Sequence, residues 1–274
     1  MSITLIVTIT ILTYFQKLCY TNLMKTQEQA KSVKTKTGRL KAKLLGTYYG
    51  HPIKDMKLIC ITGTTGKTEV ANYVHEILKA AGQPVSIMAS DQEIKIGALH
   101  KFLSTAWKAG SNYVVVTAPA KSLEKEVFYD LPVHIAALTN FVPAGLDDPT
   151  AGEYASAETA LFNMNPAYVV LNRDDSHYQD FTEFAGREGT LTYGSDRFSN
   201  IQIVRSKLYK MGAEAELAIG NTNFTVATFL TSEPVISYMA AAAAIADALH
   251  ITPAKIEEGI ANYDPDNLTK PEID

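Results

Sequence analysis

Apolar runs and amphipathic segments alternate along the chain from residue 57 onward. Short apolar runs predict buried strands when turn residues flank them. We expect such strands at 57–62, 84–90, 112–119, 133–140, 167–175 and 189–194. Apolar residues at helical spacing predict helices between these strands, at 69–82, 96–110 and 154–164. The first two of these helices end at a glycine, which is a common helix stop.

The pattern changes after residue 198. Three strand-like segments, 201–211, 214–221 and 222–230, predict a small antiparallel meander. An alanine-rich helix is expected at 237–251, and a last helix at 252–263 has Thr252 as its expected cap. Strands separated by helices favour a parallel sheet covered on both faces. We therefore predict an α/β fold: a three-layer, mostly parallel sheet flanked by helices, with a small antiparallel β extension.

Composition narrows the class of protein. The chain has 274 residues, of which 46% are hydrophobic and 20% are charged, so a sizeable core is expected and a disordered chain is not. The net charge of -4 gives no general attraction to nucleic acid, and we expect no nucleic-acid partner. The two cysteines, Cys19 and Cys60, form no disulfide or metal-binding pattern. Cys60 lies in a predicted strand and is expected to be a small buried apolar residue.

The first 16 residues carry no charge, and a basic stretch follows from Lys17 to Lys43. An uncharged start with a basic flank is typical of a membrane anchor whose basic side stays in the cytoplasm. The apolar run is short for a span, which needs about 20 residues. Two interpretations stay open: a cytoplasmic protein tethered through residues 1–16, and a cytoplasmic protein with an N-terminal extension that the fold does not need.

One turn carries candidate chemistry. The stretch "ITGTTGKT" joins a predicted strand to a predicted helix. Glycines let the backbone curl, and the curl and the helix start direct N–H groups at a phosphate chain. Lys67 adds a positive charge, and the Thr68 hydroxyl is a Mg²⁺ ligand in loops of this kind. The predicted nucleotide-binding residues of the loop are Gly63, Thr64, Thr65, Gly66, Lys67 and Thr68.

The match to the general phosphate-loop pattern is incomplete, because Ile61 stands where a glycine is expected. The alternative is a glycine turn that only joins strand to helix. No carboxylate follows the third predicted strand, which argues against a general P-loop phosphotransferase. We expect a nucleotide at the carboxyl ends of the strands, where open α/β sheets bind ligands.

The loop and several segments after it resemble the Mur ligases, ATP-dependent enzymes that add amino acids to peptidoglycan precursors, and most of all the UDP-N-acetylmuramyl-tripeptide synthetases. The resemblance rests on "ITGTTGKT", "VHIAALTNF", "YASAETALF" and "AYVVLNRDD", which occur in the family's order and extend over residues 45–265. Folylpolyglutamate synthetases share the loop. The resemblance implies a central ATP-binding domain of P-loop type with ATP and Mg²⁺ as cofactors. It also implies that Asn140, Asn172 and Asp175 lie near the nucleotide.

The chain departs from the family where metal ligands are expected. Thr117 stands in place of a strand-end glutamate, and Ala144 and Gly145 stand in place of an Asp-His pair, although Asp147 keeps its family position. Glu158 stands where the family carries a lysine that becomes carbamylated and binds a second metal. Two interpretations of Glu158 stay open: a metal ligand that imitates the carbamate, and an ordinary solvated helix residue. Ser122 is either a remnant of serines that the family carries after this strand or a helix cap, and we favour the cap.

Two functions follow from the resemblance. The first is an ATP-dependent amide ligase that acts through an acyl phosphate, with Lys67 and Glu158 as catalytic residues and Thr68 and Glu158 as metal ligands. We expect this activity to be impaired in the chain alone. Its expected partners are ATP, a UDP-N-acetylmuramyl-peptide, an amino acid and a protein that supplies missing domains. The second is a nucleotide-binding pseudo-ligase that regulates or scaffolds cell-wall synthesis. The expected organisation is an extension at 1–44, the central domain at 45–265 and a tail at 266–274, with the family's C-terminal ligase domain absent.

Overall fold

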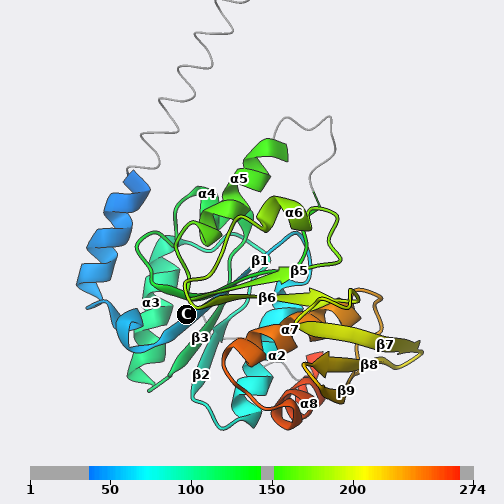
Figure 1. Cartoon of the computed structure of the whole chain (residues 1–274). Helices are drawn as coiled ribbons and strands as arrows, with labels where there is room; N and C mark the ends of the chain where they lie inside the picture. Colours follow the sequence, from blue (N-terminus) through cyan, green and yellow to red (C-terminus); the bar gives the residue numbers. More distant parts are fainter. Residues whose placement is uncertain (1–36, 143–150, 266–274) are drawn as a thin grey trace, which may run out of the picture.

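A computed structural model describes residues 37–142 and 151–265, and its centre is a single nine-stranded sheet (Figure 1). The strands run in the order β2-β3-β1-β4-β5-β6-β7-β8-β9. Their bounds are β1 Lys57–Thr62, β2 Val85–Met88, β3 Tyr113–Thr117, β4 Val133–Leu138, β5 Tyr168–Asn172, β6 Gly189–Gly194, β7 Ile201–Tyr209, β8 Gly212–Ile219 and β9 Thr222–Thr228. All pairs from β2 to β7 are parallel, and the last two pairs are antiparallel.

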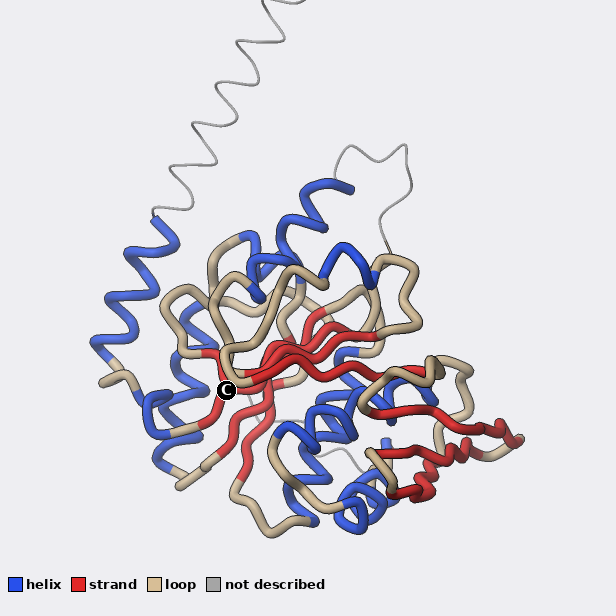
Figure 2. The backbone as a smooth tube through the Cα atoms, in the orientation of Figure 1, coloured by secondary structure: helices blue, strands red, loops and turns tan. Residues whose placement is uncertain are grey.

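Helices cover both faces of the sheet, which gives the predicted three layers (Figures 1 and 2). One face packs against α2 Lys67–Ala80, α7 Val235–Ala248 and α8 Pro253–Asn262. The other face packs against α3 Ile96–Lys108, α4 Ala120–Glu124, α5 Ala151–Phe162 and α6 Tyr178–Phe181. The short 3₁₀ helix η1, Pro52–Asp55, leads into β1. The predicted α/β class is confirmed.

Strand β1 shows why the parallel strands have uninterrupted apolar sequences. Ile59 and Ile61 point into the core with α2 and α7, whereas Leu58 and Cys60 point into the core on the opposite face. All four are fully buried. Because successive side chains of a strand alternate between faces, a strand covered on both sides must be apolar at every position. Cys60 is a buried core residue, as expected, and burial raises the pKa of its thiol.

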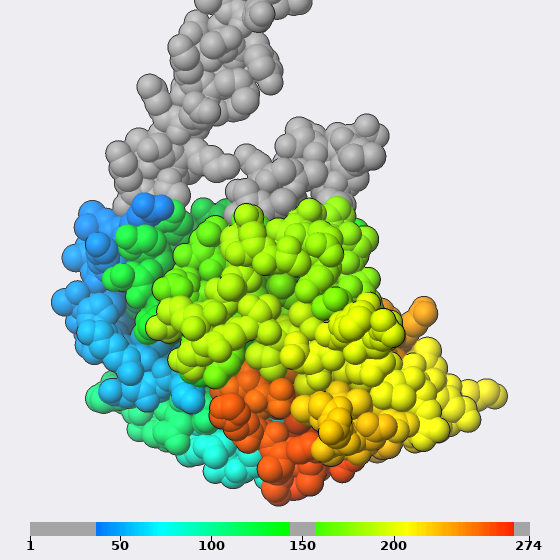
Figure 3. All heavy atoms as spheres, viewed as in Figure 1, coloured from blue at the N-terminus to red at the C-terminus, as the bar shows by residue number. Residues whose placement is uncertain are grey.

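The antiparallel strands continue the main sheet. The sequence predicted a small antiparallel extension, and β7–β9 form it, but they do not make a sheet of their own. Strand β7 pairs with β6 only at Tyr193↔Ile201 and Gly194↔Gln202, and β8 is the only other strand with which it pairs. The β7–β8 hairpin therefore projects from the body of the molecule (Figures 1 and 3).

Small residues let the C-terminal helices pack closely. Helix α7 buries a run of alanines, Ala240–Ala244, against the sheet. A Cβ atom added at Gly259 of α8 would lie 2.2 Å from the Cα atom of Ile77 in α2, so only glycine fits between these helices. Thr252 is the N-cap residue of α8, as predicted, although its side chain makes no capping hydrogen bond.

A helix at 37–48 precedes the sheet and crosses residue 45, where the domain boundary was predicted. Arg39 in this helix forms a 2.6 Å ion pair with Glu126 and lies over the ring of Tyr129. Among the described residues, no helix has both the length and the apolar character needed to cross a bilayer. The predicted anchor at 1–16 and the tail at 266–274 lie outside the described residues.

Candidate functional site

The loop that carries the predicted chemistry lies where the strand order reverses. Strand β1 is flanked by β3 on one side and by β4 on the other, so the chain turns to opposite sides after these central strands. Open α/β sheets bind ligands in the crevice that this reversal leaves at the carboxyl ends of the strands. The loop after β1 leads into α2 at this edge of the sheet. The loops after β2, β3, β4 and β5 start at the same edge.

Gly63 and Gly66 give the loop its shape. Their φ angles are 129° and 80°, which side chains rarely allow. A Cβ atom at Gly63 would lie 2.2 Å from Thr139 Oγ1, and one at Gly66 would lie 2.1 Å from the ring of Tyr238. Gly66 is also the N-cap residue of α2, so the amino end of a 14-residue helix opens directly onto the loop. Both glycines are therefore required by conformation and by space.

Hydrogen bonds from β4 and α7 hold the middle of the loop. Asn140 Oδ1 accepts from the Thr65 N–H at 2.9 Å, and Asn140 Nδ2 donates to Thr65 Oγ1 at 2.7 Å. Thr139 Oγ1 donates to the Thr65 carbonyl at 2.6 Å, and the Tyr238 hydroxyl contacts Thr65 Oγ1 at 3.2 Å. The Thr64 N–H donates to the Asn140 carbonyl at 3.0 Å. Asn140, predicted near the nucleotide, braces the loop. Tyr238 was not expected from the sequence.

Lys67 lies at the base of the loop and is only 6% exposed. Its ammonium group donates to the carbonyls of Gly63 at 2.8 Å and Thr64 at 3.2 Å. It also lies 4.0 Å from Asp91 Oδ1. The lysine charge is thus held inside the curve of the loop, which is the position from which a phosphate chain would be neutralised.

The Thr68 hydroxyl donates to Asp91 Oδ1 at 3.0 Å, and Asp91 is a residue that the sequence reasoning missed. Asp91 follows β2, and the predicted site drew on the loops after β1, β4 and β5 and on Glu158 of α5. The position of an acid directly after a predicted strand was the available signal. Thr117, at the end of β3, is fully buried, and its hydroxyl accepts from the Ser90 N–H and donates to the Ser90 carbonyl, both at 2.8 Å.

Glu158 of α5 is buried, with 4% exposure, so the interpretation as a solvated helix residue is wrong. Its Oε2 atom has no hydrogen-bond partner among the described residues. The pKa of Glu158 is raised to about 7, because burial and the nearby Asp175 carboxylate, which raise it, outweigh the nearby Lys67, which lowers it. A buried carboxylate without a full set of partners is costly to ionise, and a bound cation would remove that cost.

Asn172 ends β5, Asp175 follows it, and both form hydrogen bonds to residues that follow β4. Asn172 Nδ2 donates to the Thr139 carbonyl at 3.2 Å, and the Asp175 carboxylate accepts from the N–H groups of Phe141 at 2.7 Å and His177 at 2.8 Å. These contacts position the loops after β4 and β5. The departures predicted at Ala144 and Gly145, and Asp147, lie outside the described residues.

Hard oxygen donors at this edge fit Mg²⁺ together with a nucleotide. Mg²⁺ is usually bound by one or two protein oxygens, with phosphate oxygens and water completing the octahedron. The Thr68 hydroxyl, the Asp91 carboxylate and the unpartnered Glu158 oxygen are donors of that kind. In the part of the chain that the structure describes, no group of three or more His, Cys, Asp or Glu side chains could hold a metal by itself.

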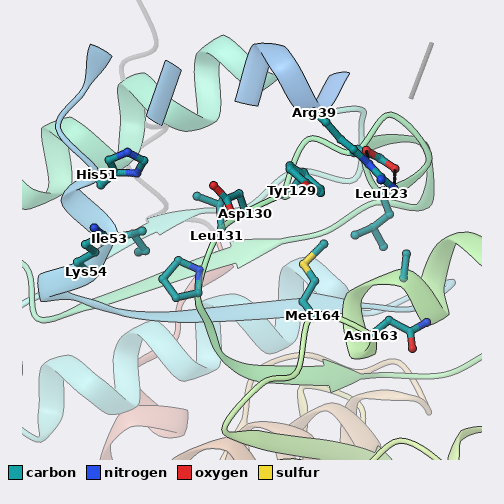
Figure 4. A pocket seen from close by; sticks show the side chains of 13 residues that line it. Arg39, His51, Ile53, Lys54, Leu123, Tyr129, Asp130, Leu131, Asn163 and Met164 are labelled. Atoms are coloured by element: carbon teal, nitrogen blue, oxygen red, sulfur yellow. Dashed lines mark hydrogen bonds and ion pairs between the residues drawn. The ribbon is translucent and has the colours of Figure 1, made fainter. Parts of the chain in front are cut away.

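A hollow of about 870 Å³ lies at the end of the sheet opposite the candidate site (Figure 4). It is lined by residues that precede β1, such as His51 and Lys54, by Leu131 and Pro132 before β4, and by Met164 after α5. These residues stand at the amino ends of the strands. The phosphate loop follows the carboxyl end of β1, so this hollow is separate from the candidate site.

The family model described as the Mur ligase middle domain matches residues 61–246, which include the loop, the buried glutamate and most of α7. The chain belongs to the Mur ligase middle-domain family. The predicted resemblance is confirmed, and with it the place of the chain in a family of peptidoglycan precursor synthesis.

Curated relatives of this Mur ligase domain are about twice as long as the region they share with it. The UDP-N-acetylmuramoyl-L-alanyl-D-glutamate–2,6-diaminopimelate ligase of Bacillus licheniformis is 28% identical over 246 residues, which cover 82% of this chain and 50% of the relative. The enzyme of the same name from Listeria monocytogenes is 26% identical over 236 residues, or 78% of this chain and 48% of the relative. The chain therefore spans about half the length of these relatives.

Solved structures share the fold. A structure of a UDP-N-acetylmuramoyl-L-alanyl-D-glutamate–2,6-diaminopimelate ligase superposes with a TM-score of 0.73 at 21% identity and covers 83% of this chain and 50% of that chain. The folylpolyglutamate synthase of Mycobacterium tuberculosis, solved with ADP, superposes with a TM-score of 0.69 at 13% identity and covers 82% of this chain and 62% of that chain. The Mur ligase domain fold extends over most of the chain.

Proposed function

We propose that this Mur ligase domain binds Mg²⁺ and ATP at the loop of residues 63–68 and transfers the γ-phosphoryl group to a carboxylate of a peptidoglycan precursor. The observation that carries the proposal is the braced loop at the start of α2, with the buried Lys67 ammonium inside its curve. Several relatives are named for ligating an amino acid to such a precursor, and solved neighbours were obtained with ADP.

The reaction requires two anions to meet. A precursor carboxylate oxygen attacks the γ-phosphorus of ATP, the bond to the β–γ bridging oxygen breaks, and ADP leaves. Lys67 and the amino end of α2 offset the charge of the phosphates, and the rigid loop aligns them for attack. Mg²⁺, when bound, would supply positive charge that offsets the negative charge of the phosphates. Thr68 and Glu158 are the residues proposed to hold it.

The acyl phosphate is then consumed by an amine. The nitrogen of an incoming amino acid attacks the acyl carbon, inorganic phosphate leaves with the C–O bond electrons, and the nitrogen loses a proton as the amide forms. In this proposal the precursor is a UDP-N-acetylmuramyl-peptide, as in the names of the relatives.

A second candidate function is a nucleotide-binding pseudo-ligase that regulates or scaffolds cell-wall synthesis. Thr117 favours it, because a hydroxyl stands where the resemblance implies a carboxylate. A hydroxyl that is already bonded to the backbone of Ser90 is a poor Mg²⁺ ligand. In this candidate the domain binds ATP and does not transfer its phosphoryl group.

Nucleotide binding is tested by calorimetric titration of ATP with and without Mg²⁺. Lys67→Ala should abolish binding, because it removes the cation that neutralises the phosphates. Lys79→Ala is the matched control, since Lys79 lies at the far end of the same helix and pairs with Glu76 on the surface. Equal affinity in the wild type and in Lys67→Ala would refute the proposed site.

The chemical step is tested by ADP formation. ATP is mixed with the protein and UDP-N-acetylmuramoyl-L-alanyl-D-glutamate, with and without 2,6-diaminopimelate. Precursor-dependent ADP release supports phosphoryl transfer, and amide formation supports the full ligase reaction. ATP binding without ADP release under any of these conditions would replace the ligase proposal with the pseudo-ligase.

A further inference from the structure

The loop after β2 brings a carboxylate to the phosphate loop. Asp91 Oδ1 accepts a hydrogen bond from Thr68 Oγ1 at 3.0 Å and lies 4.0 Å from Lys67 Nζ. The Asp91 side chain is 68% exposed, so its carboxylate is open to a ligand from the solvent side. The Thr68 hydroxyl and the Asp91 carboxylate, both beside the predicted phosphate position, are therefore in contact with each other.

The segment that carries Asp91 is held by β3 and by the residues that follow it. Thr117 Oγ1 bonds both the N–H and the carbonyl of Ser90, the residue immediately before Asp91. Further along, the Ile94 N–H donates to Ser122 Oγ at 2.8 Å. The prediction that Ser122 caps a helix is wrong, because Pro119 is the N-cap residue of α4. Both hydroxyls instead fix the loop after β2.

An uncompensated carboxylate in this place would oppose nucleotide binding. A phosphate chain over the loop would lie beside Asp91, and like charges at such range repel. Lys67 removes only part of the difficulty, because its single positive charge, 4.0 Å from Asp91 Oδ1, would have to offset both the carboxylate and the phosphates. A divalent cation between Asp91, Thr68 and the phosphates would turn the repulsion into attraction.

We propose that Asp91 binds the Mg²⁺ of Mg·ATP together with Thr68, and that Thr117 positions it through Ser90. The carboxylate that P-loop nucleotide-binding proteins direct at the phosphate-loop hydroxyl would here come from the end of β2. Strands β2 and β3 are neighbours, so their carboxyl ends lie side by side at the same edge of the sheet. This inference rests on the proposed ATP binding.

The proposal predicts effects of opposite sign for Asp91→Asn. With Mg²⁺, the variant should bind ATP more weakly than the wild type, and the gain in affinity on adding Mg²⁺ should fall at least about tenfold. Without Mg²⁺, the variant should bind ATP more tightly than the wild type, because a negative charge beside the phosphates is gone. Titration calorimetry with ATP in Mg²⁺ and in EDTA measures both affinities.

Glu93→Gln is the matched control. Glu93 lies two residues further along the same loop and pairs with Lys125, away from the phosphate loop. It should keep the wild-type affinities in both conditions. Binding of Mn²⁺ in the presence of the ATP analogue AMPPCP, followed by electron paramagnetic resonance, gives a direct readout of the metal. It should weaken in Asp91→Asn and stay unchanged in Glu93→Gln.

The outcomes separate the two proposals. If the wild type binds no ATP in either condition, the proposed function fails and this inference fails with it. If the wild type binds ATP and Asp91→Asn keeps the full Mg²⁺-dependent gain, nucleotide binding stands and the role of Asp91 is refuted. A wild type that binds ATP without any effect of Mg²⁺ also refutes the role of Asp91.

Discussion

Replacing Glu158 with glutamine should stabilise the protein at alkaline pH and have little effect in acid. The carboxyl group is buried, one of its oxygens has no hydrogen-bond partner among the described residues, and burial raises its pKa to about 7. The unfolded chain holds the same group in water, where its pKa has the ordinary value of 4.5. Between pH 4.5 and about 7, the folded protein therefore keeps a proton on Glu158 that the unfolded chain has lost.

The sign follows from this difference in proton binding. Below the unfolded pKa both states are protonated, and Glu158 has no ionisation cost. As the pH rises through the window from 4.5 to about 7, the free energy of unfolding falls. The full shift corresponds to about 3 kcal/mol of lost stability above pH 7. Glutamine has nearly the same shape and does not ionise, so the variant keeps its stability through this window.

The assay is urea unfolding of the wild type and of Glu158→Gln from pH 5 to pH 8, without nucleotide or divalent metal. The variant should gain up to about 3 kcal/mol over the wild type as the pH rises. Glu183→Gln is the control, because Glu183 is exposed and its charge stays in water in both states. A stability difference between wild type and Glu158→Gln that stays constant with pH would refute the reasoning.

Three further predictions test the loop and the packing that supports it. Gly66→Ala forces a side chain into φ 80° and against the ring of Tyr238. It should lower the free energy of unfolding by about 1–3 kcal/mol in thermal unfolding and abolish ATP binding in calorimetry. Wild-type binding would contradict this. Asn140→Ala removes two hydrogen bonds to Thr65 of the loop. It should weaken ATP binding about tenfold in the same titration, while the melting temperature changes little. Unchanged affinity would show that these hydrogen bonds are dispensable. Gly259→Ala places a Cβ atom 2.2 Å from the α2 backbone and should destabilise the fold by about 1–3 kcal/mol in urea unfolding. Gly97→Ala is the control, because Gly97 has open space around it and the change should not destabilise the fold. Equal effects of the two changes would contradict the close-packing argument.

The sequence was sufficient for the fold because most of its strands are buried on both faces. Runs such as those of β1 and β3 are apolar at nearly every position, and the glycine-rich turn between β1 and α2 has a strong local signature. The continuity of the sheet was not predictable in the same way. Two backbone pairs between β6 and β7 join the antiparallel strands to the rest, and no side-chain pattern encodes them.

The candidate site was predictable only where its residues are local in sequence. The loop from Gly63 to Thr68 is one continuous segment. Asp91 reaches it only because β2 lies at the edge next to β3, and strand order is a property of the fold. The burial of Glu158 was left undecided for a related reason: the segment around it has alanines on several sides, so the pattern did not indicate which face meets the core.

Helix α7 contacts both the parallel strands and the antiparallel strands β7–β9, which the hydrogen bonds of the sheet join through only two residue pairs. Its first turn carries Tyr238, which contacts Thr65 in the phosphate loop, and its alanines pack against the antiparallel strands beyond β6. The sheet itself crosses this junction through only two residue pairs. Shape complementarity, more than hydrogen bonding, therefore holds the two halves together. Because Tyr238 and these alanines belong to one helix, a shift of the loop would reach the antiparallel strands through the packing of α7 and not through the sheet.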